Sequence, residues 1–134
     1  MDCIFCSIVA GESPAHKVYE NDRVLAFIDI FPKTKGHVLV IPKKHAENIF
    51  DISQQDLHAV ADAAKLVAEK QKSALLAGGV SLFQLNGKLG QQTVFHYHVH
   101  VMPRYEDNQK IEFRDKHTSK EGEFEELAKK LSCE

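Results

Sequence analysis

Hydrophobic and polar positions alternate in short runs along most of this chain, and a single long stretch repeats at helical spacing. Short apolar runs that are rich in branched and aromatic residues and bounded by turn residues are typical of strands. Five such runs predict strands, over residues 17–20, 24–28, 37–41, 80–85 and 95–102.

The segment after Ser53 repeats apolar residues three and four positions apart, which predicts a long amphipathic helix. Ser53 is a good N-cap, and Asp56 would complement the positive end of the helix. Gly78 and Gly79 are expected to end it. Shorter apolar stretches near both termini, 4–9 and 124–131, predict short helices. Runs of strands separated by one long helix favour the α+β class, an antiparallel sheet with helices on one face.

Length and charge limit the classes to which this protein can belong. A chain of 134 residues fits one domain, 1–134, and can bury one core. The net charge of −2 indicates no basic surface, so we expect neither nucleic acid nor an anionic membrane as a partner. No apolar run approaches the roughly 20 residues of a membrane span. The start, Met1-Asp2-Cys3, lacks the features of a signal peptide, which predicts a cytoplasmic protein.

Three histidines alternate with apolar residues in the last predicted strand. On a strand, His96, His98 and His100 would share one face. The apolar residues that alternate with them would share the other face and join the core; these are Phe95, Tyr97, Val99 and Val101. Three interpretations are open. The row is a polar face that happens to carry histidine, a three-histidine catalytic zinc site toward which the strand must bend, or a site of phosphoryl chemistry with one imidazole as nucleophile.

Other segments also carry candidate chemistry. Cys3-x-x-Cys6 places two thiols within reach of one metal ion, although idle cysteines and a redox pair are alternatives. The glycine-containing loop 86–93 could bring backbone N–H groups to an anion, but such a loop is often only a turn. Asp29, at the end of a predicted strand, is either an ordinary carboxylate or a binding group.

The histidine segment carries a resemblance to a known family. His96-Tyr97-His98-Val99-His100-Val101-Met102, preceded by Gln92-Thr93-Val94-Phe95, resembles the signature of the histidine-triad superfamily. Asp22-Arg23-x-Leu-Ala-Phe-x-Asp29 and His37-x-Leu-Val-Ile-Pro-Lys-Lys-His45 are similar to its nucleotide-binding Hint branch. The resemblance covers a core of about 3–104, and the extension 105–134 is expected to help set specificity. It implies a five-stranded antiparallel sheet with one long helix, joined across a homodimer into ten strands.

The resemblance also implies a reaction. His98 and His100 would be the catalytic residues: His98 attacks the α-phosphorus of a nucleotide, and His100 holds phosphate oxygens and helps the leaving group. Water then hydrolyses the nucleotidyl-His98 intermediate, and no catalytic metal is expected. The implied activity is that of an adenosine 5′-monophosphoramidase-like hydrolase. The alternatives are a dinucleoside-polyphosphate hydrolase and a nucleotide- and zinc-binding adaptor with little turnover.

The substrate implied by the resemblance is a purine nucleotide. Asp29 would accept hydrogen bonds from the ribose hydroxyls, and an apolar base pocket would be formed by Phe5, Phe27 and Ile30. The phosphate or the leaving group would contact Asn86, Gln92 and Thr93. Gln91 departs from the glycine that relatives often carry there, which leaves the preference for a leaving group open. His37 either orients the active histidines or caps a strand.

Resemblance to family members with the same cysteine pair, and to the related uridylyltransferases, implies a zinc site. Its four ligands would be Cys3, Cys6, His45 and His96. With four protein ligands the site would be structural, one zinc ion per chain. Cys133 would then be a free thiol without a role in the zinc site. The remaining histidines show no pattern of partners and are predicted to lie on the surface; they are His16, His58 and His117.

Overall fold

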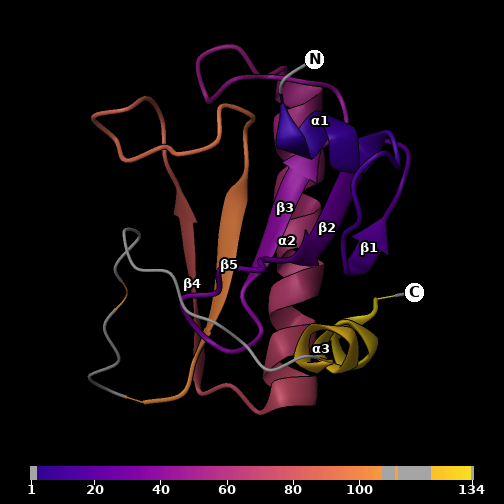
Figure 1. Cartoon of the computed structure of the whole chain (residues 1–134). Coiled ribbons are helices and arrows are strands. Elements are labelled where there is room, and N and C mark those ends of the chain that lie inside the picture. The colour runs from indigo at the N-terminus through magenta and orange to yellow at the C-terminus, as the bar shows by residue number, and fades with distance from the viewer. Residues whose placement is uncertain (1–2, 107–110, 112–121, 134) are drawn as a thin grey trace.

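The computed structural model describes residues 3–106, 111 and 122–133. Five strands form one antiparallel sheet in the order β1-β2-β3-β5-β4 (Figure 1). The strands are β1 (Lys17–Glu20), β2 (Val24–Ile28), β3 (Val38–Pro42), β4 (Gly79–Gln84) and β5 (Val99–Arg104). The helices are α1 (Ile4–Val9), the long α2 (Gln54–Leu75) and α3 (Glu123–Leu131). The predicted α+β architecture is confirmed.

Helices lie on both faces of the sheet, which differs from the expectation of helices on one face. Helices α2 and α3 pack on one face, whereas the short α1 packs on β2 and β3 on the other (Figure 1). Successive strand residues point to opposite faces, so Ala26 packs toward α2 while Leu25 and Phe27 pack toward α1. Strands β2 and β3 are buried at every position, which explains why they read as continuous apolar runs.

Helix α2 begins as predicted and ends earlier than predicted. The Ser53 hydroxyl accepts a hydrogen bond from the backbone N–H of Asp56 at 3.1 Å. The Asp56 carboxylate pairs with Arg23 at 2.9 Å, which ties the helix start to the turn before β2. The helix ends at Leu75, and Leu76 forms the C-cap with a left-handed φ of 56°. Gly79, expected to end the helix, instead opens β4.

Strand β5 is shorter than predicted at its N-terminal end, because the ladder with β3 stops there. At this end of the ladder, the final pair is Val40 with Val99. Two positions further along β3 is Pro42, which has no N–H to donate. The N–H of Tyr97 donates instead to the carbonyl of Ala46, at 2.7 Å. The segment 95–98 therefore leaves the sheet, and only one of the three histidines lies within a strand.

This departure corrects two expectations about the histidine segment. The three histidines do not share one face of a regular strand, since His96 and His98 precede β5 and His100 lies within it. Phe95 is 46% exposed and is not part of the core. The other three apolar residues that alternate with the histidines are buried as predicted: Tyr97, Val99 and Val101.

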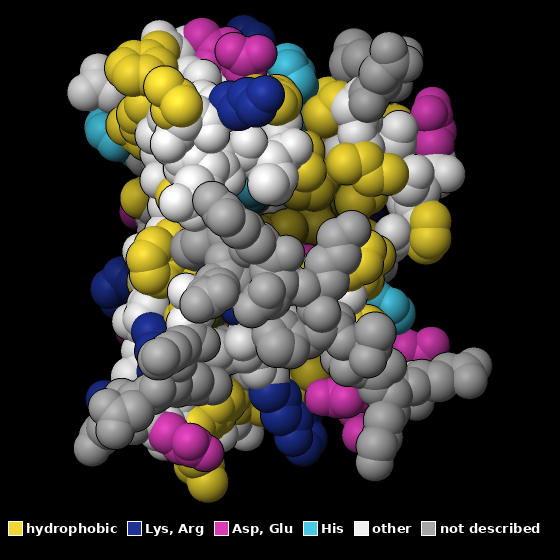
Figure 2. Space-filling model, turned by 60° about the vertical axis from the view of Figure 1, so that its left-hand side comes forward, with side chains coloured by type: hydrophobic (Ala, Val, Ile, Leu, Met, Phe, Trp, Pro, Cys, Tyr) yellow, Lys and Arg dark blue, Asp and Glu magenta, His cyan; other side chains and the backbone are white. Residues whose placement is uncertain are grey.

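Two further observations concern the surface. Among the described residues, no helix is both long and apolar enough to cross a membrane. On the face that Figure 2 shows, the described Lys and Arg side chains are interspersed with acidic ones rather than gathered in one patch.

Candidate functional site

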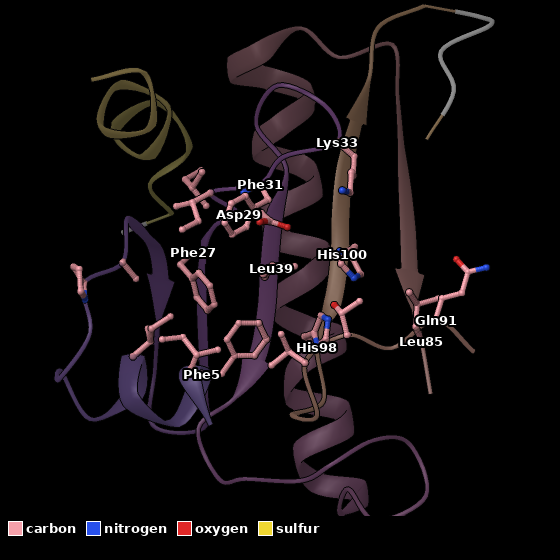
Figure 3. A pocket seen from close by; sticks show the side chains of 18 residues that line it. Phe5, Phe27, Asp29, Phe31, Lys33, Leu39, Leu85, Gln91, His98 and His100 are labelled. Atoms are coloured by element: carbon pink, nitrogen blue, oxygen red, sulfur yellow. Dashed lines mark hydrogen bonds between the residues drawn. The ribbon is translucent and has the colours of Figure 1, made fainter. Parts of the chain in front are cut away.

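A cavity of about 520 Å³ lies beside α1 and the sheet face that α1 covers. This volume is in the range of sites for small molecules. Seven residues singled out from the sequence line it: Phe5, Phe27, Asp29, Ile30, Thr93, His98 and His100. In Figure 3 the two histidines lie between the phenylalanine rings on one side and Leu85 and Gln91 on the other. The cavity thus combines apolar walls with a few polar groups.

The ring of His98 is held in one protonation state. Its Nδ1 lies 2.7 Å from the backbone carbonyl oxygen of His96. A carbonyl oxygen only accepts, so Nδ1 carries the proton and Nε2 keeps a lone pair. Burial lowers the pKa of His98, which favours the neutral ring. His98 therefore has the form in which an imidazole is a nucleophile.

In His100 the proton is on the other ring nitrogen, Nε2. The hydrogen bonds of His37 determine this. The backbone N–H of Lys33 donates to His37 Nδ1 at 3.1 Å, so the proton of His37 is on Nε2. His37 Nε2 lies 3.0 Å from His100 Nδ1, which must accept. The proton of His100 is consequently on its Nε2. Burial lowers the pKa of His37 to about 3 and that of His100 to about 2, so both rings are neutral.

His37 contacts a cavity histidine through Nε2 and also accepts backbone N–H groups beside β3, from Lys33 and Asp29. It directly precedes β3 and is fully buried. The question left open by the sequence has a geometric answer, because its Nε2–H is directed at His100.

Asp29 lies next to the same pair. Its Oδ1 accepts a hydrogen bond from the N–H of Phe31 at 2.8 Å, and its Oδ2 is 3.6 Å from His37 Nε2. Burial raises the pKa of the Asp29 carboxyl. Ligand atoms of Asp29, His37 and His100 lie within 4.8 Å of one another, a spacing that could hold a metal ion. The proton assignment argues against that, since a metal ligand needs a lone pair and His37 Nε2 carries a hydrogen.

The loop that was expected to bind phosphate holds itself together with two of its own side chains. Gln92 accepts from the N–H of Gly87 at 2.7 Å and donates to the carbonyls of Glu47 and Val94, at 2.6 and 3.0 Å. Asn86 exchanges hydrogen bonds with Gln84 and accepts from the N–H of Ile49. Neither Asn86 nor Gln92 lines the cavity, whereas Thr93 does.

Two polar residues of the cavity were not assigned a role from the sequence. Gln91 has a left-handed φ of 71°, a backbone conformation that favours glycine. Glycine is also the residue that the resemblance leads us to expect at position 91. Its side chain lines the cavity (Figure 3). Lys33 also lines the cavity. A lysine in a loop between Pro32 and Gly36 gives no periodic signal, so the sequence alone does not separate it from a solvated residue.

The four predicted metal ligands come together at the N-terminal end of α1. One ligand atom each from Cys3, Cys6, His45 and His96 lies within 4.8 Å of the others. Cys3 Sγ and Cys6 Sγ lie 3.3 and 3.5 Å from His96 Nδ1. The Nδ1 atoms of His45 and His96 are 3.2 Å apart. A tetrahedral zinc ion, with Zn–S about 2.3 Å and Zn–N about 2.0 Å, separates its ligand atoms by about 3.3–3.8 Å.

The protonation of His96 also fits a metal ligand. Its Nε2 lies 2.8 Å from the carbonyl oxygen of Pro42, so that nitrogen carries the proton. The lone pair on Nδ1 therefore faces the thiols of Cys3 and Cys6. Donor types, spacing and orientation all suit zinc.

Among the described residues, the other cysteine and histidines belong neither to the cavity nor to the four-ligand group; these are Cys133, His16 and His58. Cys133 is half-buried, with its Sγ 3.4 Å from the carbonyl of Leu131. His58 is exposed, as predicted. His16 is half-buried, with its ring centre 5.8 Å from that of Phe124, so it is not a simple surface residue. His117 lies outside the described residues.

Comparison with known proteins identifies relatives along most of the chain. A family model described as the HIT domain matches residues 10–107. The curated "Protein hit" of Bacillus subtilis is 44% identical over 108 residues, which is 78% of this chain and 72% of that protein.

Solved structures of similar proteins have the same fold. A HIT-like protein from Bartonella henselae, described as involved in cell-cycle regulation, has a TM-score of 0.90 at 37% identity, over 98% of this chain and 94% of that one. A zinc-bound histidine-triad family protein from Mycobacterium smegmatis has a TM-score of 0.86 at 36% identity, covering 98% and 91%. A hypothetical histidine-triad nucleotide-binding protein from Sulfolobus tokodaii has a TM-score of 0.87 at 34% identity, covering 97% and 89%.

The resemblance seen in the histidine segment thus extends to the sheet, the long helix and the terminal helices. With the family model matching residues 10–107 and similar structures covering nearly the whole chain, this protein belongs to the HIT (histidine-triad) family.

Proposed function

We propose that this protein is a nucleotide-binding hydrolase that transfers a nucleotidyl group to His98 and then to water. The observation that carries the proposal is the pair of cavity imidazoles in opposite states, a lone pair on His98 Nε2 and an N–H on His100 Nε2. One ring can attack phosphorus while the other donates to a phosphate oxygen or a leaving group. The family relationship and the nucleotide-binding relative from Sulfolobus tokodaii support the assignment.

The substrate class follows from the cavity walls. The apolar side chains of Phe5, Phe27 and Ile30 suit a purine base, and the carboxylate of Asp29 suits the paired hydroxyls of a ribose. Thr93 lies on the same cavity and can contact the phosphate or the leaving group. We propose a nucleoside 5′-phosphoramidate as the substrate, as in an adenosine 5′-monophosphoramidase.

The reaction proceeds in two displacements. His98 Nε2 forms a bond to the α-phosphorus while the bond from phosphorus to the amine breaks, and the amine leaves with the proton of His100 Nε2. Water then attacks the same phosphorus and returns a proton to His100 Nε2, the P–N bond to His98 breaks, and a nucleoside monophosphate is released. Splitting one displacement into two lowers each barrier, and the neutral ring of His98 attacks without a separate base.

The test is turnover of adenosine 5′-phosphoramidate by the wild-type protein, by His98→Ala and by His58→Ala. Loss of the nucleophile should lower kcat by about a thousandfold or more while AMP still binds. His58 is an exposed histidine of α2, so His58→Ala should keep the wild-type rate. The nucleophile assignment is wrong if His98→Ala keeps more than a tenth of the activity. Faster turnover of diadenosine polyphosphates would indicate the related polyphosphate hydrolase, and no turnover of either class would indicate an adaptor.

We also propose that Cys3, Cys6, His45 and His96 hold one structural zinc ion. Their spacing and the orientation of His96 Nδ1 support it, as does the zinc-bound relative from Mycobacterium smegmatis. A zinc ion with four protein ligands has no open position for substrate, so its contribution would be to stability. It would attach the N-terminal segment to the histidine segment.

We further propose a homodimer that pairs β4 with β4 of a second copy. Strand β4 is an edge of the sheet, and none of its residues is buried. Leu82, in the middle of this edge, is 52% exposed. An exposed edge with apolar side chains is a template for pairing with another chain, and pairing two such edges would join the sheets into ten strands.

A further inference from the structure

Gln71 is a buried amide near the C-terminal end of α2, on the helix face that packs on the sheet. Its side chain is fully buried. Its Nε2 donates two hydrogen bonds, to the carbonyl of Gly36 at 3.0 Å and to the carbonyl of Val101 at 2.9 Å. One helix side chain therefore bridges two backbone segments that are 65 positions apart in the sequence.

Each of the two carbonyls lies next to a histidine of the site. Gly36 directly precedes His37, and Val101 directly follows His100. The imidazoles of these two histidines are 3.0 Å apart, and their hydrogen bond determines which nitrogen of His100 carries the proton. At the end opposite to the Val40–Val99 pair, the β3–β5 ladder stops at Val38 and Val101, so Gly36 lies beyond the strand pairing. Gln71 joins the two segments where the ladder ends.

The backbone at Gly36 is shaped for this contact. Gly36 has a left-handed φ of 88°, and a Cβ there would lie 2.5 Å from the Cδ1 of Leu75, one turn along α2 from Gln71. The absence of a side chain lets the loop lie against the helix. This close approach brings the carbonyl of Gly36 within reach of the amide of Gln71.

The amide of Gln71 satisfies two backbone carbonyls, which an apolar side chain of the same length could not do. Its own Oε1 atom has no hydrogen-bond partner among the described residues. The unsatisfied buried oxygen costs stability, so the two donated hydrogen bonds are what the amide contributes here. The feature that only the amide provides is its pair of N–H donors, both of which are used on the segments that carry the paired histidines.

We propose that Gln71 is a positioning residue for His100. By fixing the distance between the backbones at Gly36 and Val101, it keeps His37 Nε2 in hydrogen-bond contact with His100 Nδ1 and so keeps the proton of His100 on Nε2. The effect of Gln71 on turnover rests on the proposed function of His98 and His100. Its effect on the two imidazoles does not, and it can be measured without substrate.

The first measurement uses the nitrogen NMR spectrum of the histidine rings in the wild-type protein and in Gln71→Met. Methionine has a similar length and volume but no donor. In the wild type, we expect His100 to show one protonated nitrogen, Nε2, and an accepting Nδ1. In Gln71→Met the two signals should move toward the averaged values of an imidazole that exchanges between tautomers. Unchanged His37 and His100 signals in a folded Gln71→Met protein would overturn the proposal.

The second measurement is steady-state turnover of adenosine 5′-phosphoramidate. Misplacement of a catalytic group by less than 1 Å can cost a factor of about 10 to 100, so kcat should fall by that amount while KM changes less than about threefold. In a His100→Ala background, Gln71→Met should lower kcat no further, because its target is already absent. Independent, multiplying effects of the two substitutions would show a role unrelated to His100. Lack of turnover in the wild type, together with the NMR change, would reject the proposed function and leave the positioning role standing.

Val67→Ala is the matched control, since Val67 is a fully buried residue one turn earlier on α2 that contacts neither histidine segment by hydrogen bonds. It should lower the melting temperature without changing the histidine spectrum or the ratio of kcat to KM. The same spectral change in Val67→Ala would reduce Gln71 to an ordinary packing residue. If Gln71→Met does not fold, Gln71→Asn withdraws the amide by one methylene and must show the same loss of kcat and the same spectral change.

Discussion

Three hydrogen bonds determine which nitrogen of each cavity imidazole carries a proton. The carbonyl of His96 accepts from His98, the N–H of Lys33 donates to His37, and His37 donates to His100. Two of these bonds use backbone groups, which cannot change their donor or acceptor character. Because of these bonds, His98 presents a lone pair on Nε2 to the cavity and His100 presents an N–H.

The buried histidines should make stability depend on pH. In the unfolded chain His37 titrates near 6.5, whereas burial lowers its pKa in the folded protein to about 3. The unfolded state therefore takes up the proton first, so this contribution to stability is complete above about pH 6.5 and is lost as the pH falls toward 3. The limiting slope is about 1.4 kcal/mol per pH unit for each such ring.

Urea unfolding between pH 7.5 and 5 checks this expectation. The charged and titratable groups that act on His37 are Lys33, Asp29, His98 and His100. Asp29 opposes the trend, because burial raises the pKa of its carboxyl. His37→Asn should show a shallower loss of unfolding free energy with acid than the wild type, and His58→Asn should match the wild type. Equal slopes in all three proteins would contradict the assignment of His37 as a buried neutral ring.

Asp29 gives a second expectation at this scale. If its carboxylate accepts the ribose hydroxyls, Asp29→Ala should weaken AMP by about 1.5–3 kcal/mol, which is about 10- to 100-fold in Kd. Binding of 2′,3′-dideoxy-AMP should change little, because that ligand lacks both donors. Isothermal titration calorimetry of the two ligands separates these effects. Equal weakening of both would mean that Asp29 acts on the shape of the cavity and not on the ribose.

At the scale of elements, the sequence predicted most strands and helices because their signals are local. Strands β1 and β2 have the predicted bounds, and the cap at Ser53 is where the hydroxyl and the acidic first turn indicated. The end of α2 was misplaced, because glycine is the usual left-handed residue at a helix end and here Leu76 takes that conformation. The β3–β5 ladder ends where β3 reaches Pro42. Because Pro42 belongs to another strand, the pattern of residues 95–102 does not show where the ladder ends.

In the candidate site, too, the local features were predicted from the sequence and the long-range contacts were not. The side chains of His98, His100 and Asp29 reach one cavity, as the motif implied. The neighbours that set their chemistry lie far away in the sequence: His37 is 63 positions from His100, and Gln71 acts through carbonyls of two different segments. Such pairs have no local signature. Their contacts depend on the packing of α2 against the sheet.

The left-handed cap of α2 predicts a stabilising substitution. Leu76 has a φ of 56° and is 84% exposed, so its side chain contributes little packing while its backbone is strained. Leu76→Gly should raise the free energy of unfolding by about 0.5–1 kcal/mol, after the larger chain entropy of glycine is subtracted. Leu66→Gly, within the same helix and also largely exposed, should lower it by about 1 kcal/mol. Chemical denaturation of both variants decides the matter, and a destabilised Leu76→Gly would show that the cap is not strained.

At the scale of the whole molecule, the open edge at β4 predicts association. Light scattering after size exclusion should give twice the chain mass of 15.1 kDa. Leu82→Lys places a charge in the middle of the proposed contact and should produce a monomer. Leu66→Lys, on the outer surface of α2, should remain a dimer. A monomeric wild type would reject the paired sheet.

Zinc provides the second expectation at this scale. The purified protein should contain about one zinc ion per chain, and His96→Ala should lose much of it by elemental analysis. Structural zinc contributes on the order of 10 kcal/mol in small domains, and less here because a core holds the sheet, so the melting temperature should fall measurably. His98→Ala should keep its zinc. Loss of the ion in His98→Ala, with retention in a Cys3 and Cys6 double variant, would assign the metal to the three histidines instead.

Residue 96 contributes to both sites through different groups. Its imidazole belongs to the group of four side chains proposed to hold zinc, whereas the group that fixes the tautomer of His98 is its backbone carbonyl. Every amino acid has that carbonyl, so a different residue at position 96 would still accept the proton of His98 Nδ1. The proposed metal site and the proposed nucleophile are thus separable within one short motif: a change of the four ligands would alter stability and leave the protonation of His98 as it is.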